Sequence, residues 1–169
     1  MTDRDISAAC QIRERPRNDG EITMLNEYPA TSVSTQLRVR YAETDQMGVV
    51  YHANYLVWFE IGRTDFCRAQ GFAYREMEER DGLYIMVAEV KCRYTAPARY
   101  DDDIRVLTRL RGLRKRVLVF AYEVYRLPEE ELLAEGETVH VITDREGRPR
   151  VLPEKYRDLF LAGIQPPET

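Results

Sequence analysis

The chain has 169 residues, of which 44% are apolar and 32% are charged, and its formal net charge is -4. This length and composition predict one globular domain with a single core. The small negative charge excludes a general attraction to nucleic acid or to anionic membranes. No apolar window is long enough for a membrane span, and the N-terminus lacks the hydrophobic core of a signal peptide. We therefore expect a cytoplasmic protein that does not insert into a membrane.

The first part of the chain, residues 1–34, mixes charged and turn-forming residues with little apolar periodicity. This composition predicts a flexible N-terminal extension. From Gln36 onward, apolar residues alternate with polar ones, which is the pattern of a half-buried strand. We expect the folded domain to occupy residues 35–163 and a C-terminal tail to occupy residues 164–169.

A long helix is predicted by the segment NYLVWFEIGRTDFCRAQG, which starts at Asn54. Its aromatic residues follow helical spacing, and Leu56, Val57 and Ile61 widen the apolar stripe beyond one face. Such a helix should be surrounded by protein. Gly71 is the expected end of the helix.

Four strand-like runs follow a polar helix or loop at residues 74–82, and the connections between them are short. Short connections favour antiparallel pairing. The runs cover residues 83–95, 104–110, 117–125 and 132–143, and a short helix is expected after Pro153. The predicted fold class is α+β, with a curved antiparallel sheet wrapped around one long central helix.

Several common chemistries are excluded by residue usage. The three serines, Ser7, Ser32 and Ser34, all fall in the predicted extension, and no glycine-rich phosphate cradle is present. Two histidines without paired cysteines or an H-E-x-x-H motif make a metal site unexpected. Cys67 falls well inside the apolar helix, where a cysteine usually behaves as a small hydrophobe. Catalysis by a carboxylate side chain is the chemistry that these exclusions leave.

The stretch YAETDQMGVVYHANY, residues 41–55, places Asp45 in the turn after the first strand and His52 just before the helix. A helix N-terminus presents unpaired N–H groups and a partial positive charge, which suits a developing oxyanion. The residues expected at this end are Gly48, Val50, Tyr51 and His52. A carboxylate opposite a polarised carbonyl can act as a general base or as a nucleophile, which suits thioester hydrolysis. Alternatively, Asp45 caps its turn and His52 has only a local role at the helix start.

The segment RVRYAETDQMGVVYHANYLVWFEIGRTDF resembles the signature of the 4-hydroxybenzoyl-CoA thioesterase family of hot-dog-fold acyl-CoA thioesterases, especially its Tol-Pal-associated branch. The later run YTAPARYDDDIRV is also similar, and the resemblance extends from about Gln36 to Phe160. It implies the hot-dog fold and the hydrolysis of an acyl-CoA to a free acid and coenzyme A. The implied reaction requires no cofactor, since coenzyme A is part of the substrate.

The resemblance also implies roles for particular residues. Asp45 takes the position of the catalytic aspartate, accompanied by Tyr41 and His52, and the His52 amide would polarise the thioester carbonyl. Homodimers with active sites at the subunit interface are implied, and homotetramers are also common in this fold. Some thioesterases of the superfamily use a helix glutamate, which makes Glu60 the reserve candidate.

The basic run at residues 109–116 lies between two predicted strands and has two interpretations. Charge runs are usually solvated hairpin tips. In the family, basic residues at this point contact the phosphates of coenzyme A, which implies this role for Arg114, Lys115 and Arg116. The chain departs from the family pattern in its N-terminal extension and at Gln46 and Met47.

Two other functions remain open. A hot-dog enoyl-CoA hydratase has an aspartate and a histidine five residues apart around Asn-Pro, whereas Asp45 and His52 are seven apart with no Asn-Pro between them. A non-catalytic acyl-CoA-binding protein would share the binding residues. The sequence also leaves open the acyl group and the choice between coenzyme A and an acyl-carrier protein as its carrier.

Overall fold

The computed structural model describes residues 23–24 and 32–162. The rest of the predicted N-terminal extension and the tail at residues 164–169 lie outside the described residues. None of the helices within the described ranges is long and apolar enough to cross a membrane.

The described strands form one antiparallel sheet, and the predicted α+β layout is confirmed. Its order is β1-β4-β5-β6-β3, and β2 pairs with the same edge of β4 as β1 does. The strand bounds are β1 Thr23–Met24, β2 Ser32–Arg38, β3 Tyr84–Tyr94, β4 Asp103–Leu113, β5 Val117–Arg126 and β6 Glu131–Thr143. The four strand-like runs predicted from the sequence correspond to β3 to β6.

The first long strand, β2, begins at Ser32, earlier than the alternation from Gln36 indicated. Thr35 is buried, and its hydroxyl donates a 3.0 Å hydrogen bond to Asp65 of the central helix. Thr23 and Met24 also pair with β4. The sheet therefore includes residues that the sequence analysis placed in the extension.

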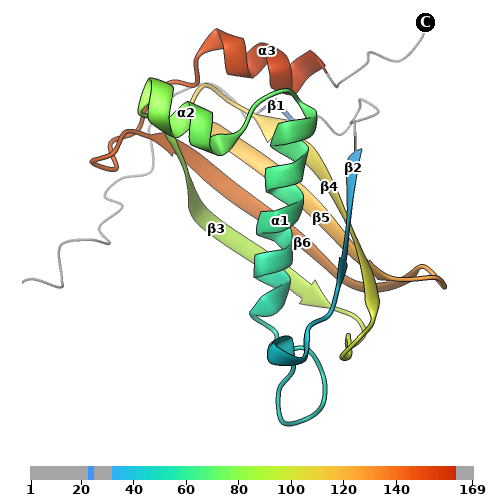
Figure 1. Cartoon of the computed structure of the whole chain (residues 1–169). Helices are drawn as coiled ribbons and strands as arrows, with labels where there is room; N and C mark the ends of the chain where they lie inside the picture. The colour runs from blue at the N-terminus through green and yellow to red at the C-terminus, as the bar shows by residue number, and fades with distance from the viewer. Residues whose placement is uncertain (1–22, 25–31, 163–169) are drawn as a thin grey trace, which may run out of the picture.

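The central helix, α1 (Asn54–Ala69), lies along the concave side of the sheet (Figure 1). It packs Trp58, Phe59 and Phe66 into the core, each at most 2% exposed. The Phe59 ring stacks on Tyr122 of β5 with centroids 4.4 Å apart. The helix ends at Ala69 with Gln70 as its C-cap, and Gly71 follows with a φ of 95°, as its predicted role at the helix end requires.

The two ends of α1 have different surroundings (Figure 1). Its C-terminal end meets α2 (Tyr74–Asp81) and α3 (Glu154–Ala162), and Phe66 packs against Phe160 of α3. Its N-terminal end meets the loop of residues 41–53, which begins with a single 3-10 turn, η1 (Tyr41–Glu43). This loop carries the predicted catalytic residues.

One side of α1 remains open. Leu56, Val57 and Ile61 are between 38% and 43% exposed, although the wide apolar stripe predicted a helix enclosed by protein. The edge strand β3 also exposes apolar residues, among them Met86, Val87 and Val90. Among the described residues of one chain, nothing covers this apolar surface.

Candidate active site

The loop of residues 41–53 is hydrogen-bonded to the connection between β3 and β4. Within the loop, the Val50 amide donates to the Ala98 carbonyl at 2.8 Å, and just before the loop the Val39 amide donates to the Asp102 carbonyl at 3.0 Å. A bridge between Thr44 and Val50 closes the loop on itself. The helix start is therefore held in a fixed place at one end of the sheet.

Glu43 anchors this loop and was not found by the sequence analysis. Its buried carboxylate accepts hydrogen bonds from the Arg40 amide at 2.7 Å and from the Trp58 indole at 3.1 Å. Burial raises the pKa of Glu43, but the hydrogen bonds from Arg40 and Trp58 outweigh it, so the pKa lies below the usual range. Its carbonyl accepts from the Tyr51 amide and from the Asn54 side chain. Glu43 is thus an ionised structural acid.

Asp45 is half-buried in a tight turn in which Gly48 has a φ of 71°. One carboxylate oxygen, Oδ1, accepts the Met47 amide at 2.8 Å. The other oxygen has no donor among the described residues. Asp45 therefore caps its own turn and still keeps one oxygen for chemistry.

The helix-start amides differ in availability. The amides of Gly48, Val50 and Tyr51 donate to the carbonyls of Asp45, Ala98 and Glu43, respectively. In the described part of the chain, the His52 amide has no acceptor. The sequence predicted that all four residues contribute to an oxyanion site, whereas in the structure the amides of the other three are already bonded and that of His52 is not.

The direction of the His52 N–H follows from its peptide unit. The Tyr51 carbonyl accepts the Asn54 amide at 2.9 Å, so it points toward the helix. In a planar trans peptide the N–H points the opposite way, which directs the His52 N–H out of the helix end. The cap residue Ala53 makes no side-chain cap, and the first turn contains no acid. No cap or acid in the first turn of the helix itself therefore offsets the positive end of its dipole.

The other predicted catalytic side chains lie at the surface. Tyr41 is 78% exposed and packs edge-on against Tyr100, with ring centroids 5.6 Å apart. The exposed His52 ring lies against Tyr51, with centroids 4.3 Å apart. Within the described ranges neither side chain forms a hydrogen bond with Asp45.

The predicted phosphate-binding residues form the hairpin between β4 and β5. The Arg114 amide donates to Val117 at 2.8 Å, and the carbonyls of Lys115 and Arg116 accept from Leu152 and Ile142. This hairpin follows the end of β4, whereas the loop of residues 41–53 is fastened next to the start of β4. Because β4 has 11 residues, at about 3.3 Å each, the two regions lie roughly 35 Å apart in one chain.

The structure also locates two other residues considered for catalysis, Cys67 and Glu60. Cys67 is fully buried, and burial raises the pKa of its thiol to about 12, so it is not a thiolate near neutral pH. Glu60 is exposed on α1 beside a shallow hollow of about 210 Å³ that also includes Val57 and Ile61. No group of three potential metal-ligating side chains occurs within the described ranges.

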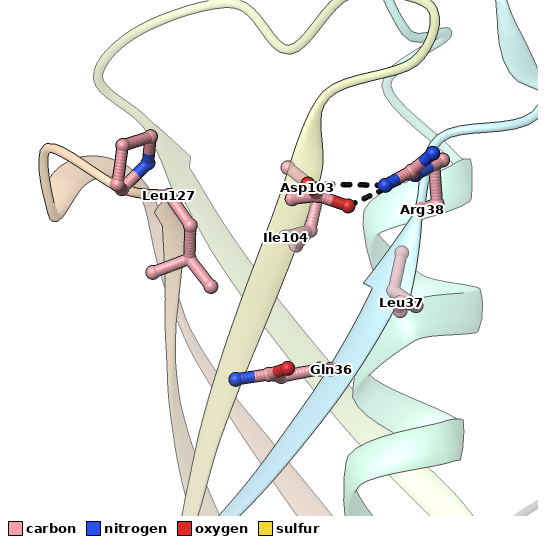
Figure 2. A pocket seen from close by; sticks show the side chains of 7 residues that line it. Gln36, Leu37, Arg38, Asp103, Ile104 and Leu127 are labelled. Carbon is pink, nitrogen blue, oxygen red and sulfur yellow. Dashed lines mark hydrogen bonds and ion pairs between the residues drawn. The ribbon is translucent and has the colours of Figure 1, made fainter.

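A larger hollow, of about 630 Å³, lies where β2 ends, β4 begins and the β5–β6 turn approaches (Figure 2). Arg38 and Asp103 form an ion pair in its wall, with Nε and Oδ1 2.9 Å apart. Leu37, Ile104 and Leu127 provide its apolar part. None of the predicted catalytic residues lines this hollow.

Comparisons with known proteins agree with this architecture. Residues 39–163 match the model of the Thioesterase-like superfamily. A putative acyl-CoA thioesterase, YneP of Bacillus subtilis, is 40% identical over 125 residues, which cover 74% of this chain and 87% of that protein.

Solved structures of other proteins share this fold. A hypothetical protein from Thermus thermophilus has a TM-score of 0.74 at 39% identity, covering 80% of this chain and all of that one. The 4-hydroxybenzoyl-CoA thioesterase of Pseudomonas sp. strain CBS-3 has a TM-score of 0.70 at 22% identity, covering 77% and 99% of the two chains, and shows likeness of fold alone. The resemblance noted from the sequence is confirmed: this chain belongs to the Thioesterase-like superfamily and has the hot-dog fold of the 4-hydroxybenzoyl-CoA thioesterases.

Proposed function

We propose that this protein hydrolyses acyl-CoA thioesters to a free acid and coenzyme A, with Asp45 as the catalytic carboxylate. The start of α1 supports this function, because the His52 amide, which has no acceptor among the described residues, points out of a helix end with no side-chain cap and no first-turn acid. That is the group a thioester carbonyl needs when its oxygen gains negative charge. The relatives named as acyl-CoA thioesterases support the same chemistry.

In the general-base form of the reaction, the free Asp45 oxygen takes a proton from water. The water oxygen bonds to the thioester carbon, and the resulting oxyanion accepts a hydrogen bond from the His52 amide. The C–S bond then breaks, and the thiolate leaves and is protonated. In the nucleophilic form, Asp45 itself bonds to the carbonyl carbon, the C–S bond breaks and releases the thiolate, and water then hydrolyses the resulting mixed anhydride to the free acid and regenerates Asp45.

The Met47 amide favours either role. Its 2.8 Å hydrogen bond to Asp45 Oδ1 orients the carboxylate and leaves the other oxygen for the reaction. The exposed Tyr41 and His52 side chains are proposed to contact the substrate rather than Asp45.

The test is Asp45→Asn. Asparagine can still accept the Met47 amide, so the turn should persist, but an amide is neither a base nor a nucleophile. We expect kcat to fall by at least about a hundredfold, with little change in KM, in an assay of thiol release from acyl-CoA substrates. Asp101→Asn is a matched control, because Asp101 is exposed and asparagine tolerates its φ of 70°. Wild-type turnover by Asp45→Asn would remove Asp45 from the mechanism.

The position of the basic hairpin supports a second part of the proposal, a homodimer with shared sites. Within one chain, Asp45 and the hairpin with Arg114 and Lys115 lie about the length of β4 apart. If two chains associate about a two-fold axis through the open side of α1 and the edge of β3, the start of one α1 would lie near the end of the other. The exposed Leu56, Val57 and Ile61 would then be buried between subunits. The phosphates of coenzyme A would contact the hairpin of one subunit while the thioester lies at Asp45 of the other.

A further inference from the structure

Tyr94 is the last residue of β3 and lies outside the signature stretch that carries Asp45 and His52. Its hydroxyl donates a 3.0 Å hydrogen bond to the carbonyl oxygen of His52. Its ring packs edge-on against Tyr55, the second residue of α1, with centroids 5.1 Å apart. Tyr94 thus joins the end of the edge strand directly to the helix start.

The place of Tyr94 is itself well fixed. Its backbone pairs with Ala134 of β6, and the following residue, Thr95, donates its amide to Leu133 at 2.8 Å and its hydroxyl to Leu132 at 2.7 Å. Tyr55 is 2% exposed and accepts the Ala98 amide through its hydroxyl at 3.1 Å. A rigid donor therefore holds the His52 carbonyl.

The two peptide units on either side of the His52 α-carbon are both restrained. The preceding unit is held because the Tyr51 carbonyl accepts the Asn54 amide at 2.9 Å. The following unit is held only by Tyr94, since no other donor to the His52 carbonyl occurs among the described residues. With both planes fixed, the backbone torsions of His52 are fixed, and so is the direction of its free N–H.

We propose that Tyr94 is a positioning residue for hydrolysis: its hydroxyl holds the His52–Ala53 peptide so that the His52 N–H stays aimed at the developing oxyanion. This inference rests on the proposed thioesterase function and adds a residue to it. Partial burial, followed by the neighbouring Cys92, raises the pKa of the Tyr94 hydroxyl to about 12, so it remains a donor through the working pH range.

The first test is Tyr94→Phe, which removes the hydroxyl and keeps the ring contact with Tyr55. We expect kcat to fall about three- to tenfold, the range of one neutral hydrogen bond, with KM unchanged and the melting temperature lowered by only about 2 to 4 °C. Tyr84→Phe is the matched control, because Tyr84 begins the same strand and its hydroxyl has no partner within the described ranges. It should retain wild-type kcat.

A second readout follows the carbonyl directly. The slow Asp45→Asn background allows the infrared stretching frequency of a bound thioester carbonyl to be measured with and without Tyr94→Phe. We expect the frequency to rise when the tyrosine hydroxyl is absent, because a misdirected N–H polarises the carbonyl less. An unchanged kcat would overturn the inference. So would a lower kcat accompanied by an unchanged frequency, because that combination indicates a merely structural residue. Failure of the proposed function would be seen separately, as no thiol release by the wild-type protein.

Discussion

At the scale of single residues, the core contains an unusual basic pair. Arg63 of α1 is 9% exposed, and its Nη1 lies 3.3 Å from Nε2 of the fully buried His140 on β6. No carboxylate within the described ranges is paired with Arg63. Because a guanidinium only donates hydrogen bonds, His140 Nε2 must accept, which requires a neutral imidazole.

This geometry predicts a particular pH dependence of stability. Burial and then the Arg63 charge lower the pKa of His140 to about 3, against about 6.5 in the unfolded chain. As pH falls below about 6.5, the unfolded state gains a proton that the native state does not. The free energy of unfolding should therefore decrease, by up to about 1.4 kcal/mol per pH unit, until the pH approaches the folded pKa.

His140→Gln tests this prediction, because glutamine can accept from Arg63 but does not titrate. We expect the variant to be less stable near neutral pH but to lose less stability than the wild type between about pH 7 and about pH 5. Urea unfolding at the two pH values gives the comparison. Equal losses in the two proteins would show that His140 does not contribute to the acid sensitivity.

At the scale of elements, the approach of α1 to the sheet depends on a missing side chain. A Cβ added at Gly136 of β6 would lie 2.3 Å from the Phe59 ring and 3.1 Å from the Lys91 carbonyl. Phe59 is 1% exposed and stacked on Tyr122, so it has little room to move. We expect Gly136→Ala to lower the free energy of unfolding by about 1 to 3 kcal/mol in denaturant titrations.

A double-mutant cycle isolates the cause. In a Phe59→Leu background the aromatic ring is absent, so adding Gly136→Ala should cost less than it does in the wild type. Additive losses would mean that the backbone of β6, rather than the ring of α1, resists the extra methyl group.

The same elements show what the sequence could reveal. The central helix and β3 to β6 were predictable because burial of one face imposes a spacing of apolar residues. The early start of β2 was not, because Thr35 is buried through a hydrogen bond to Asp65, 30 residues away. Tyr94 was missed for a similar reason, since its acceptor is a backbone carbonyl 42 residues distant. Contacts made by polar groups across the fold leave no periodic signal.

At the scale of the whole molecule, the apolar stripe predicted an enclosed α1, yet the single chain exposes Leu56, Val57 and Ile61. A second subunit reconciles these two observations, because it would cover the stripe and supply the distant hairpin. The sequence could reveal the stripe but not what covers it, since in the proposed dimer the covering surface belongs to another copy. Shared sites would then make the subunits interdependent in catalysis.

Mixed dimers test this interdependence. Arg114→Ala with Lys115→Ala should raise KM for acyl-CoA far more than for a pantetheine thioester that lacks the nucleotide phosphates. In a purified heterodimer of this variant with Asp45→Asn, shared sites place both defects in one site and leave the other intact. We expect about half of the wild-type kcat/KM per dimer, although each parent homodimer is defective. If each chain instead built its own site, both sites of the heterodimer would carry one defect, and kcat/KM at low acyl-CoA concentration would stay near the mean of the two parents.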